Sequence, residues 1–267
     1  MDVVVLFYPP PPLLTSAVFR FRDPVFSIMS LCTLKDEVVH FLGDVDHSIL
    51  FNTPNLCENG LEDVRLFIWD GLYAIGVAHT RSKNLSTQVL MKIDGLKVVK
   101  YWPLQSPFGH SVEKNWVPIV IGKSLFLVYS FHPLIIFEFK NDKLEKVKHD
   151  DVGNISYGLR GGSPFIRFSN KYIAIGHYKG FKSEGKFYYR HFFVTMDENL
   201  NIEEESEPFF IHKPGVEFAC GIYYDKKLDE LIISYGRNDR FAVLQKFSSR
   251  TIKDMLTGFS QNINAIQ

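Results

Sequence analysis

The segment LFIWDGLYAIGVA (residues 66–78) decides the fold. Its two apolar runs, 66–68 and 72–78, flank Trp69-Asp70-Gly71, a triplet with residue types that favour tight turns. Short apolar runs that are rich in aromatic and branched residues and joined by such turns are typical of β-hairpins. The segment therefore predicts a pair of antiparallel strands with a tight connection.

Three further segments repeat this pattern along the chain. They are VPIVIGKSLFLVY (117–129), FIRFSNKYIAIGH (165–177) and ACGIYYDKKLDELIISY (219–235). The second strands end at residues 78, 129, 177 and 235, so successive units are 51, 48 and 58 residues apart. A period of about 50 residues with several strands in each unit is typical of β-propeller blades. A β-sandwich is the alternative all-β fold, but sandwiches rarely show such a repeat.

Further apolar runs complete the predicted architecture. Third strands are expected at 88–93, 134–139 and 187–196, and the runs 18–22, 26–31 and 38–42 supply a shorter first blade. The prediction is a five-bladed β-propeller that forms a single domain over residues 1–267. Its core spans 15–248, and the tail 249–267 holds a short helical stretch at 251–259.

Composition excludes several classes of function. The 30 Lys and Arg residues balance 30 Asp and Glu residues, so no basic excess exists to bind nucleic acid. The three cysteines lack the spacing of a disulfide framework or a zinc site, which favours a reducing compartment. The chain has no signal-peptide pattern and no apolar stretch of about 18 residues. We therefore expect a cytoplasmic protein without a membrane partner, a metal or an organic cofactor.

Polar residues precede the first strand of each predicted blade. In a propeller the inner strands of all blades converge on one axis, so residues at their starts meet in a central funnel. The alternative is that these residues form ordinary ion pairs at strand ends. The segments are Glu62-Asp63-Val64-Arg65, Glu113-Lys114-Asn115-Trp116, Arg160-Gly161-Gly162-Ser163 and the segment that begins at Glu217.

These segments resemble the mannoside phosphorylases, glycoside hydrolase family 130. Glu62-Asp63-Val64-Arg65 is similar to the Glu-Asp-Pro-Arg motif of that family. The pattern also resembles propeller modules that are found near or fused to glycosyltransferases. The resemblance spans roughly residues 15–248. Its further motifs lie, in the order of the family, at 113–118 with 128–133, 160–164 with 175–178, and 216–221 with 234–239.

The resemblance implies an inverting attack on a β-mannoside-type bond, with phosphate or water as the nucleophile. Asp63 would be the general acid that protonates the leaving oxygen. Inorganic phosphate, as a co-substrate, needs cations around it. The residues expected to bind the oligosaccharide substrate are Glu62, Arg65, Asn115, Tyr129, Glu217 and Asp239. Those expected on the phosphate side are Lys114, Arg160, His177 and Arg81.

Several departures from the family pattern leave other functions open. Val64 replaces the Pro of the first motif, and His132 replaces the basic residue before Pro in the third motif. Arg237 and Asn238 replace small residues in the last motif. The chain is then a phosphorylase, a hydrolase, or a catalytically inactive glycan-binding propeller that partners a glycosyltransferase. A protein-interaction propeller and a homo-oligomer also stay open.

Overall fold

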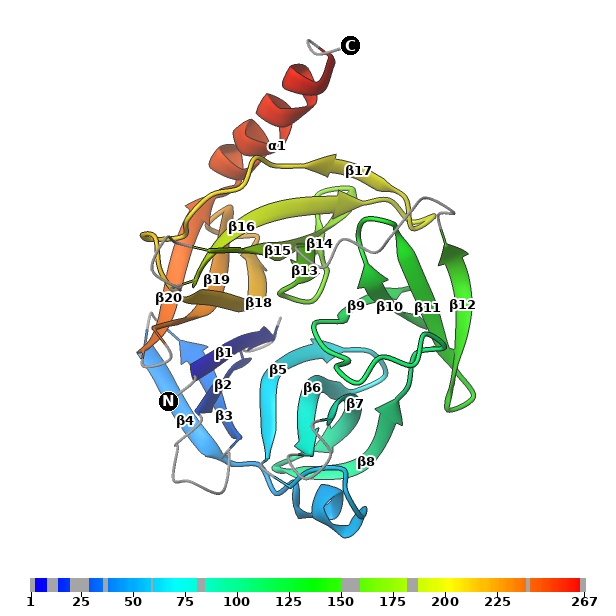
Figure 1. The fold of residues 1–267 in the computed structure, drawn as a ribbon. Helices are drawn as coiled ribbons and strands as arrows, with labels where there is room; N and C mark the ends of the chain where they lie inside the picture. Colours follow the sequence, from blue (N-terminus) through cyan, green and yellow to red (C-terminus); the bar gives the residue numbers. More distant parts are fainter. Residues whose placement is uncertain are drawn as a thin grey trace.

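A computed structural model of the chain describes residues 3–8, 14–19, 29–35, 38–58, 60–80, 85–149, 159–181, 187–238 and 241–264. These residues form strands β1 to β20, a short 3-10 turn η1 (Ser48–Asn52) and a C-terminal helix α1. The strands are arranged as sheets around a common centre, and α1 projects outward from the rim (Figure 1). The all-β propeller prediction is confirmed.

Four sheets of sequential antiparallel strands form four blades. The predicted hairpins are confirmed as β5–β6, β9–β10, β14–β15 and β18–β19. The β5–β8 blade contains β5 (Leu61–Ile68), β6 (Leu72–Thr80), β7 (Leu85–Asp94) and β8 (Lys97–Leu104). The β9–β12 blade contains β9 (Val117–Ile121), β10 (Ser124–Ser130), β11 (Ile135–Lys140) and β12 (Lys143–His149). The β13–β17 blade contains β13 (Leu159–Gly161), β14 (Ile166–Phe168), β15 (Lys171–Phe181), β16 (Phe187–Met196) and β17 (Ile202–Glu205). The β18–β20 blade contains β18 (Glu217–Asp225), β19 (Glu230–Arg237) and β20 (Phe241–Ser248).

The N-terminal strands form two separate two-stranded sheets. Strand β1 (Val3–Tyr8) pairs with β2 (Leu14–Phe19), and β3 (Ser30–Lys35) pairs with β4 (Val38–Asp44). Strand β2 lies against β3, while β1 contacts β5, β18 and β19. These strands therefore fill the gap in the ring between the first and last blades (Figure 1). Four blades are evident, and the fifth stays a prediction.

Local sequence explains the tight connections between strands. Lys140 pairs with Lys143, so only Asn141 and Asp142 connect β11 to β12. Both have positive φ, 50° and 61°. A two-residue hairpin turn of this kind needs positive φ at both central positions, and Asn and Asp tolerate that conformation better than other side chains.

The hydrophobic core lies between adjacent blades. Phe67 and Tyr73 of the β5–β8 blade pack in one buried cluster with Trp116 and Phe137 of the β9–β12 blade. Trp116 stacks on Phe137, with ring centroids 5.8 Å apart. Buried aromatic pairs of this kind contribute about 0.5–1.5 kcal/mol beyond the area that they bury. Packing between blades therefore fixes how the inner strands sit around the axis.

The predicted C-terminal helix is confirmed. Helix α1 (Ser249–Asn264) follows β20 directly, so it begins before and ends after the expected stretch. Its Ile252 and Leu256 are buried in a cluster with residues of the β13–β17 and β18–β20 blades. In the part of the chain that the structure describes, no helix has the length and apolar character of a membrane span.

Candidate functional site

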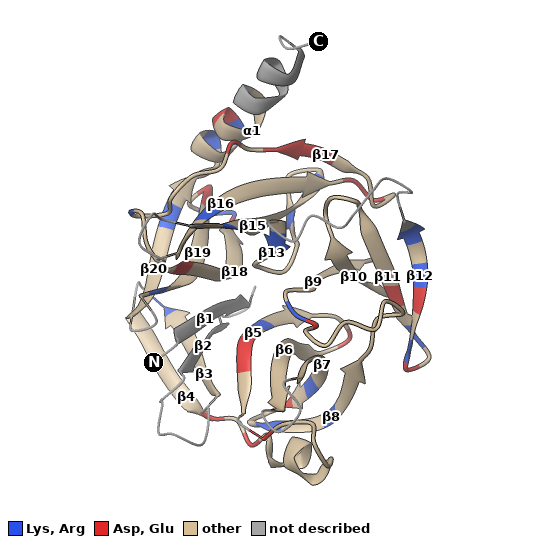
Figure 2. Cartoon of the chain, in the orientation of Figure 1, with Lys and Arg blue, Asp and Glu red and all other residues tan. Residues whose placement is uncertain are grey.

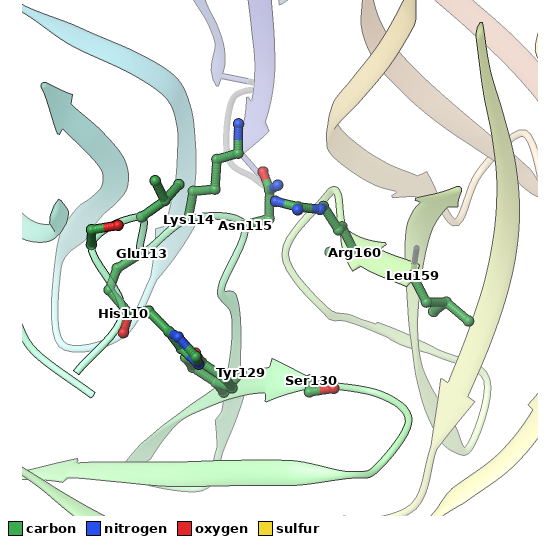
Figure 3. Close-up of a pocket in the computed structure, with 11 residues that line it drawn as sticks. His110, Glu113, Lys114, Asn115, Tyr129, Ser130, Leu159 and Arg160 are labelled. Atoms are coloured by element: carbon green, nitrogen blue, oxygen red, sulfur yellow. The ribbon is translucent and has the colours of Figure 1, made fainter. Parts of the chain in front are cut away.

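A cavity of about 270 Å³ lies between the starts of the β9–β12 and β13–β17 blades (Figure 3). It is lined by residues 110–115, by Tyr129 and Ser130 of β10, and by residues 159–161 of β13. Four residues that the sequence predicts for the site share this cavity: Lys114, Asn115, Tyr129 and Arg160. The fold thus brings together residues that are far apart in the chain.

Basic side chains give the cavity its charge. Lys114 is exposed, and Arg160 is half-buried on the adjacent blade. Basic positions before β9 and on β13 lie near the centre of the ring (Figure 2). Ammonium and guanidinium groups in one cavity suit a phosphate or another anion. Tyr129 adds an aromatic wall, since its ring lies 5.2 Å from the Trp116 and Phe108 rings.

Arg65 does not line the cavity, but it contacts Asn115, which does, and it lies where segments of four blades meet. It is 0 % exposed. Its Nε donates to the carbonyl of Gly162. Nη1 donates to the Asp63 carbonyl at 3.1 Å, and Nη2 donates to Asn115 Oδ1 at 3.0 Å. The guanidinium also lies over the ring of Phe218, 5.6 Å from its centroid. Burial lowers the pKa of Arg65, and the nearby charge of Asp63 partly opposes that shift.

Two of the residues that Arg65 contacts have a left-handed backbone. Asp63 has φ 51° and sits at a bulge of β5, where the register shifts between Glu62 and Arg65. Asn115 has φ 66° directly before β9. Such conformations cluster at functional sites, because the surrounding structure has to hold them. Asp63 is partly exposed and is not among the residues that line the cavity. Its link to the cavity is Arg65, which donates hydrogen bonds to both Asp63 and Asn115.

Glu113 is a functional candidate that the sequence analysis did not select. It lines the cavity, is 6 % exposed, and accepts a hydrogen bond from Ser106 Oγ. Burial raises the pKa of Glu113, while the Ser106 hydrogen bond and the nearby His110 partly oppose this. A carboxyl group biased toward its protonated form is able to donate a proton. The sequence feature that could have identified Glu113 is its position directly before Lys114 and Asn115 in the same motif.

Two other predicted carboxylates are engaged by the protein. Glu62 Oε2 lies 2.8 Å from His79 Nε2 on the neighbouring strand β6. Glu217 is buried and accepts hydrogen bonds from the backbone N–H groups of His212 and Lys213, each at 3.2 Å. In this structure both side chains bind neighbouring segments of the propeller.

His177 lies inside the protein, near the cavity but not in its described lining. Its ring makes edge contacts with Tyr189 and Phe218, each with ring centroids 5.1 Å apart. Burial lowers the pKa of His177 well below its usual value, and His191 and the cations at 65, 160 and 114 lower it further. The imidazole is therefore neutral at physiological pH. The other two predicted residues, Arg81 and Asp239, lie outside the described residues.

Metal ligands do not gather in the described part of the chain. No group of three or more His, Cys, Asp or Glu residues there has the arrangement of a metal site. The three cysteines are buried and free of disulfides: Cys32, Cys57 and Cys220.

Comparisons with known proteins place the fold. No family model and no curated protein sequence matches this chain. Among solved structures, an α-L-arabinanase from Cellvibrio cellulosa, complexed with arabinohexaose, matches with a TM-score of 0.53 and 9% identity over 92% of this chain and 91% of that one. An exo-1,5-α-L-arabinanase from a bovine ruminal metagenomic library matches with a TM-score of 0.55 and 11% identity over 92% and 93%.

A third similar structure is the GH43B protein of the Bacteroides ovatus xyloglucan locus. Its TM-score is 0.55 at 14% identity, and the match covers 92% of this chain and 52% of that one. At these identities the likeness defines the class by fold: the chain is a β-propeller similar in shape to glycoside hydrolase propellers. The more specific resemblance to family 130 stays a prediction.

Proposed function

We propose that this protein is a glycoside-cleaving β-propeller that transfers a β-mannoside-like sugar to phosphate. The observation that carries the proposal is the single cavity that Lys114 and Arg160 share with Asn115 and Tyr129. Two cations, an amide and an aromatic wall match the needs of phosphate and sugar binding. The propeller shape shared with arabinan-degrading enzymes supports the same class of chemistry.

The proposed reaction is an inverting phosphorolysis. An oxygen of phosphate, held by Lys114 and Arg160, forms a bond to the anomeric carbon. The glycosidic C–O bond breaks on the opposite face, and the Asp63 carboxyl gives its proton to the leaving oxygen. With water in place of phosphate the reaction is a hydrolysis, and it then also requires a carboxylate base that takes the proton of the attacking water. Glu62, Arg65, Glu217, Asp239, His177 and Arg81 stay predictions as ligand-binding residues.

The test uses the full chain and β-linked mannobiose with and without phosphate. We expect mannose 1-phosphate to appear only with phosphate and to be lost in Asp63→Asn. Asp70→Asn is the matched control, because Asp70 lies in the exposed turn at the far end of β5 and pairs with Lys92. Free mannose without phosphate would assign hydrolysis instead. No product under either condition, with the sugar bound, would refute cleavage.

A second candidate is a glycan-binding propeller without catalysis. Arg65 and Glu217 are buried in contacts with the protein, which favours this candidate because few charged groups remain to act on a substrate. Saturable binding of mannobiose in calorimetry without turnover would identify it. A glycosyltransferase partner, a homo-oligomer and a cytoplasmic location stay predictions. We also propose that β1–β2 and β3–β4 together form the fifth blade, since β1 contacts both β5 and β18.

A further inference from the structure

We propose that Arg65 is a positioning residue that fixes the amide group of Asn115 as a hydrogen-bond donor to an anion in the cavity. This inference rests on the proposed function only in naming inorganic phosphate as the anion. The sequence predicts that Arg65 contacts the ligand directly. The inference instead assigns Arg65 the role of orienting Asn115, which contacts the ligand.

The orientation of the amide follows from hydrogen-bond chemistry. Arg65 Nη2 lies 3.0 Å from the Asn115 side chain, and both residues are buried. A guanidinium group has only donors, so the atom of the amide that faces it must be the oxygen. The two N–H bonds of Asn115 Nδ2 therefore point away from Arg65. No partner for Nδ2 exists among the described residues, although Asn115 lines the cavity.

The backbone of Asn115 is held as firmly as its side chain. Its φ of 66° is a conformation that Asn and Asp tolerate best after glycine. Gly161 packs directly on the Asn115 carbonyl, where a Cβ atom would have no room. On the other side, the N–H of Trp116 donates to Gln88 Oε1 at 3.3 Å. The amide is thus pre-oriented before a ligand arrives, which lowers the entropy lost on binding.

The groups around this amide are donors as well. Lys114, Asn115 and Arg160 line the same cavity (Figure 3). An amide N–H₂, a guanidinium and an ammonium together favour a ligand that offers only acceptors and carries negative charge. Burial is the main cause of the lowered pKa of His177, and the nearby cations Arg65, Arg160 and Lys114 also lower it.

Two carboxyl groups lie close to these donors. Glu113 lines the same cavity and accepts from Ser106, and the charge of Asp63 acts on Arg65. Because the cations outnumber the carboxylates and burial favours the neutral form of Glu113, the cavity attracts anions.

The decisive variant is Asn115→Asp. Asp tolerates the same backbone conformation and gives Arg65 a carboxylate partner, so the melting temperature should stay level or rise. The variant loses both N–H donors and adds a like charge to the anion site. We expect the affinity for inorganic phosphate, measured by calorimetry on the full chain, to fall at least about tenfold. Asn115→Gly, which tolerates the same backbone conformation and removes the amide without adding a charge, should also bind phosphate more weakly, whereas a purely structural role for Asn115 would leave its phosphate affinity unchanged.

Asn170→Asp is the matched control, since residue 170 lies in the exposed turn between β14 and β15. It should bind phosphate as the wild type does. Arg65→Lys keeps the charge but loses the fork that holds the amide, so a folded variant should bind phosphate more weakly although Lys114 and Arg160 are intact. If it does not fold, Asn115→Asp decides alone.

Two results would overturn the inference: a wild-type chain that does not bind phosphate, or an Asn115→Asp variant that binds it as tightly as the wild type. The proposed function has a separate readout in mannose 1-phosphate. Phosphate binding that depends on the Asn115 amide, without cleavage of mannobiose, would therefore refute the enzyme and leave the anion site in place.

Discussion

Acid pH should destabilise this propeller through a buried histidine. His191 on β16 is 0 % exposed and lies directly opposite His177 on β15. Burial lowers the pKa of His191 from 6.5 to about 3, with only partial compensation by a backbone hydrogen bond at Glu217. The imidazole therefore stays neutral in the folded state, whereas in the unfolded chain it takes up a proton at about pH 6.5.

The size of the effect follows from proton linkage. A native pKa below the unfolded pKa gives stability that is present above about pH 6.5 and is lost as the pH falls toward about 3. Between pH 7 and pH 5 the unfolded imidazole becomes protonated and the native one does not. That difference lowers the free energy of unfolding by about 2 kcal/mol for His191 alone.

Urea unfolding at pH 7 and pH 5, followed by tryptophan fluorescence, measures this loss. In His191→Phe the loss between the two pH values should be about 2 kcal/mol smaller than in the wild type. His40→Phe, a substitution at an exposed position of β4, is the matched control and should follow the wild type. An equal loss in His191→Phe and the wild type would refute the reasoning.

Two further substitutions test the packing and the charge of the site. Gly162→Ala should lower the free energy of unfolding, measured with urea, by about 1–3 kcal/mol. The added Cβ atom would lie 2.5 Å from the Ile175 carbonyl oxygen and 2.8 Å from the Ala219 carbonyl oxygen. A variant as stable as the wild type would contradict this close packing. Glu113→Gln should be more stable than wild type at pH 8, with the difference shrinking toward pH 4. Burial raises the pKa of Glu113, so the stability contributed by this group is lost as the pH rises through its folded pKa. If the difference in the free energy of unfolding between Glu113→Gln and the wild type did not change with pH, the raised pKa of Glu113 would be contradicted.

The hairpins could be predicted because their signals are local. Apolar runs and turn residues such as Trp69-Asp70-Gly71 lie next to one another in sequence, and the repeat places them in blades. The meeting of Lys114 with Arg160 also followed from the convergence of inner strands on one axis. The N-terminal region was harder, since its strands pair as two separate hairpins and leave the fifth blade a prediction.

The burial of Arg65 could not be predicted from the sequence. An arginine at the start of a strand reads as a solvent-facing cation, and only the approach of Gly162 and Phe218 from other blades buries it. The bulge at Asp63 could not be predicted either, because the polar segment Glu62-Asp63-Val64-Arg65 indicates a strand start rather than an irregularity within β5. The sequence shows that Glu113 is a charged residue, but its burial depends on the packing around Ser106 and Trp116.

The buried guanidinium of Arg65 also affects how the propeller unfolds. Repeat proteins commonly fray from their ends, one unit at a time, since each repeat contacts only its neighbours. Here one side chain is hydrogen-bonded within three blades and packed on the fourth, so none of them opens without breaking that shared contact. The blades are thereby coupled into one cooperative unit, and their innermost amide protons should exchange with solvent together, at the rate set by global unfolding.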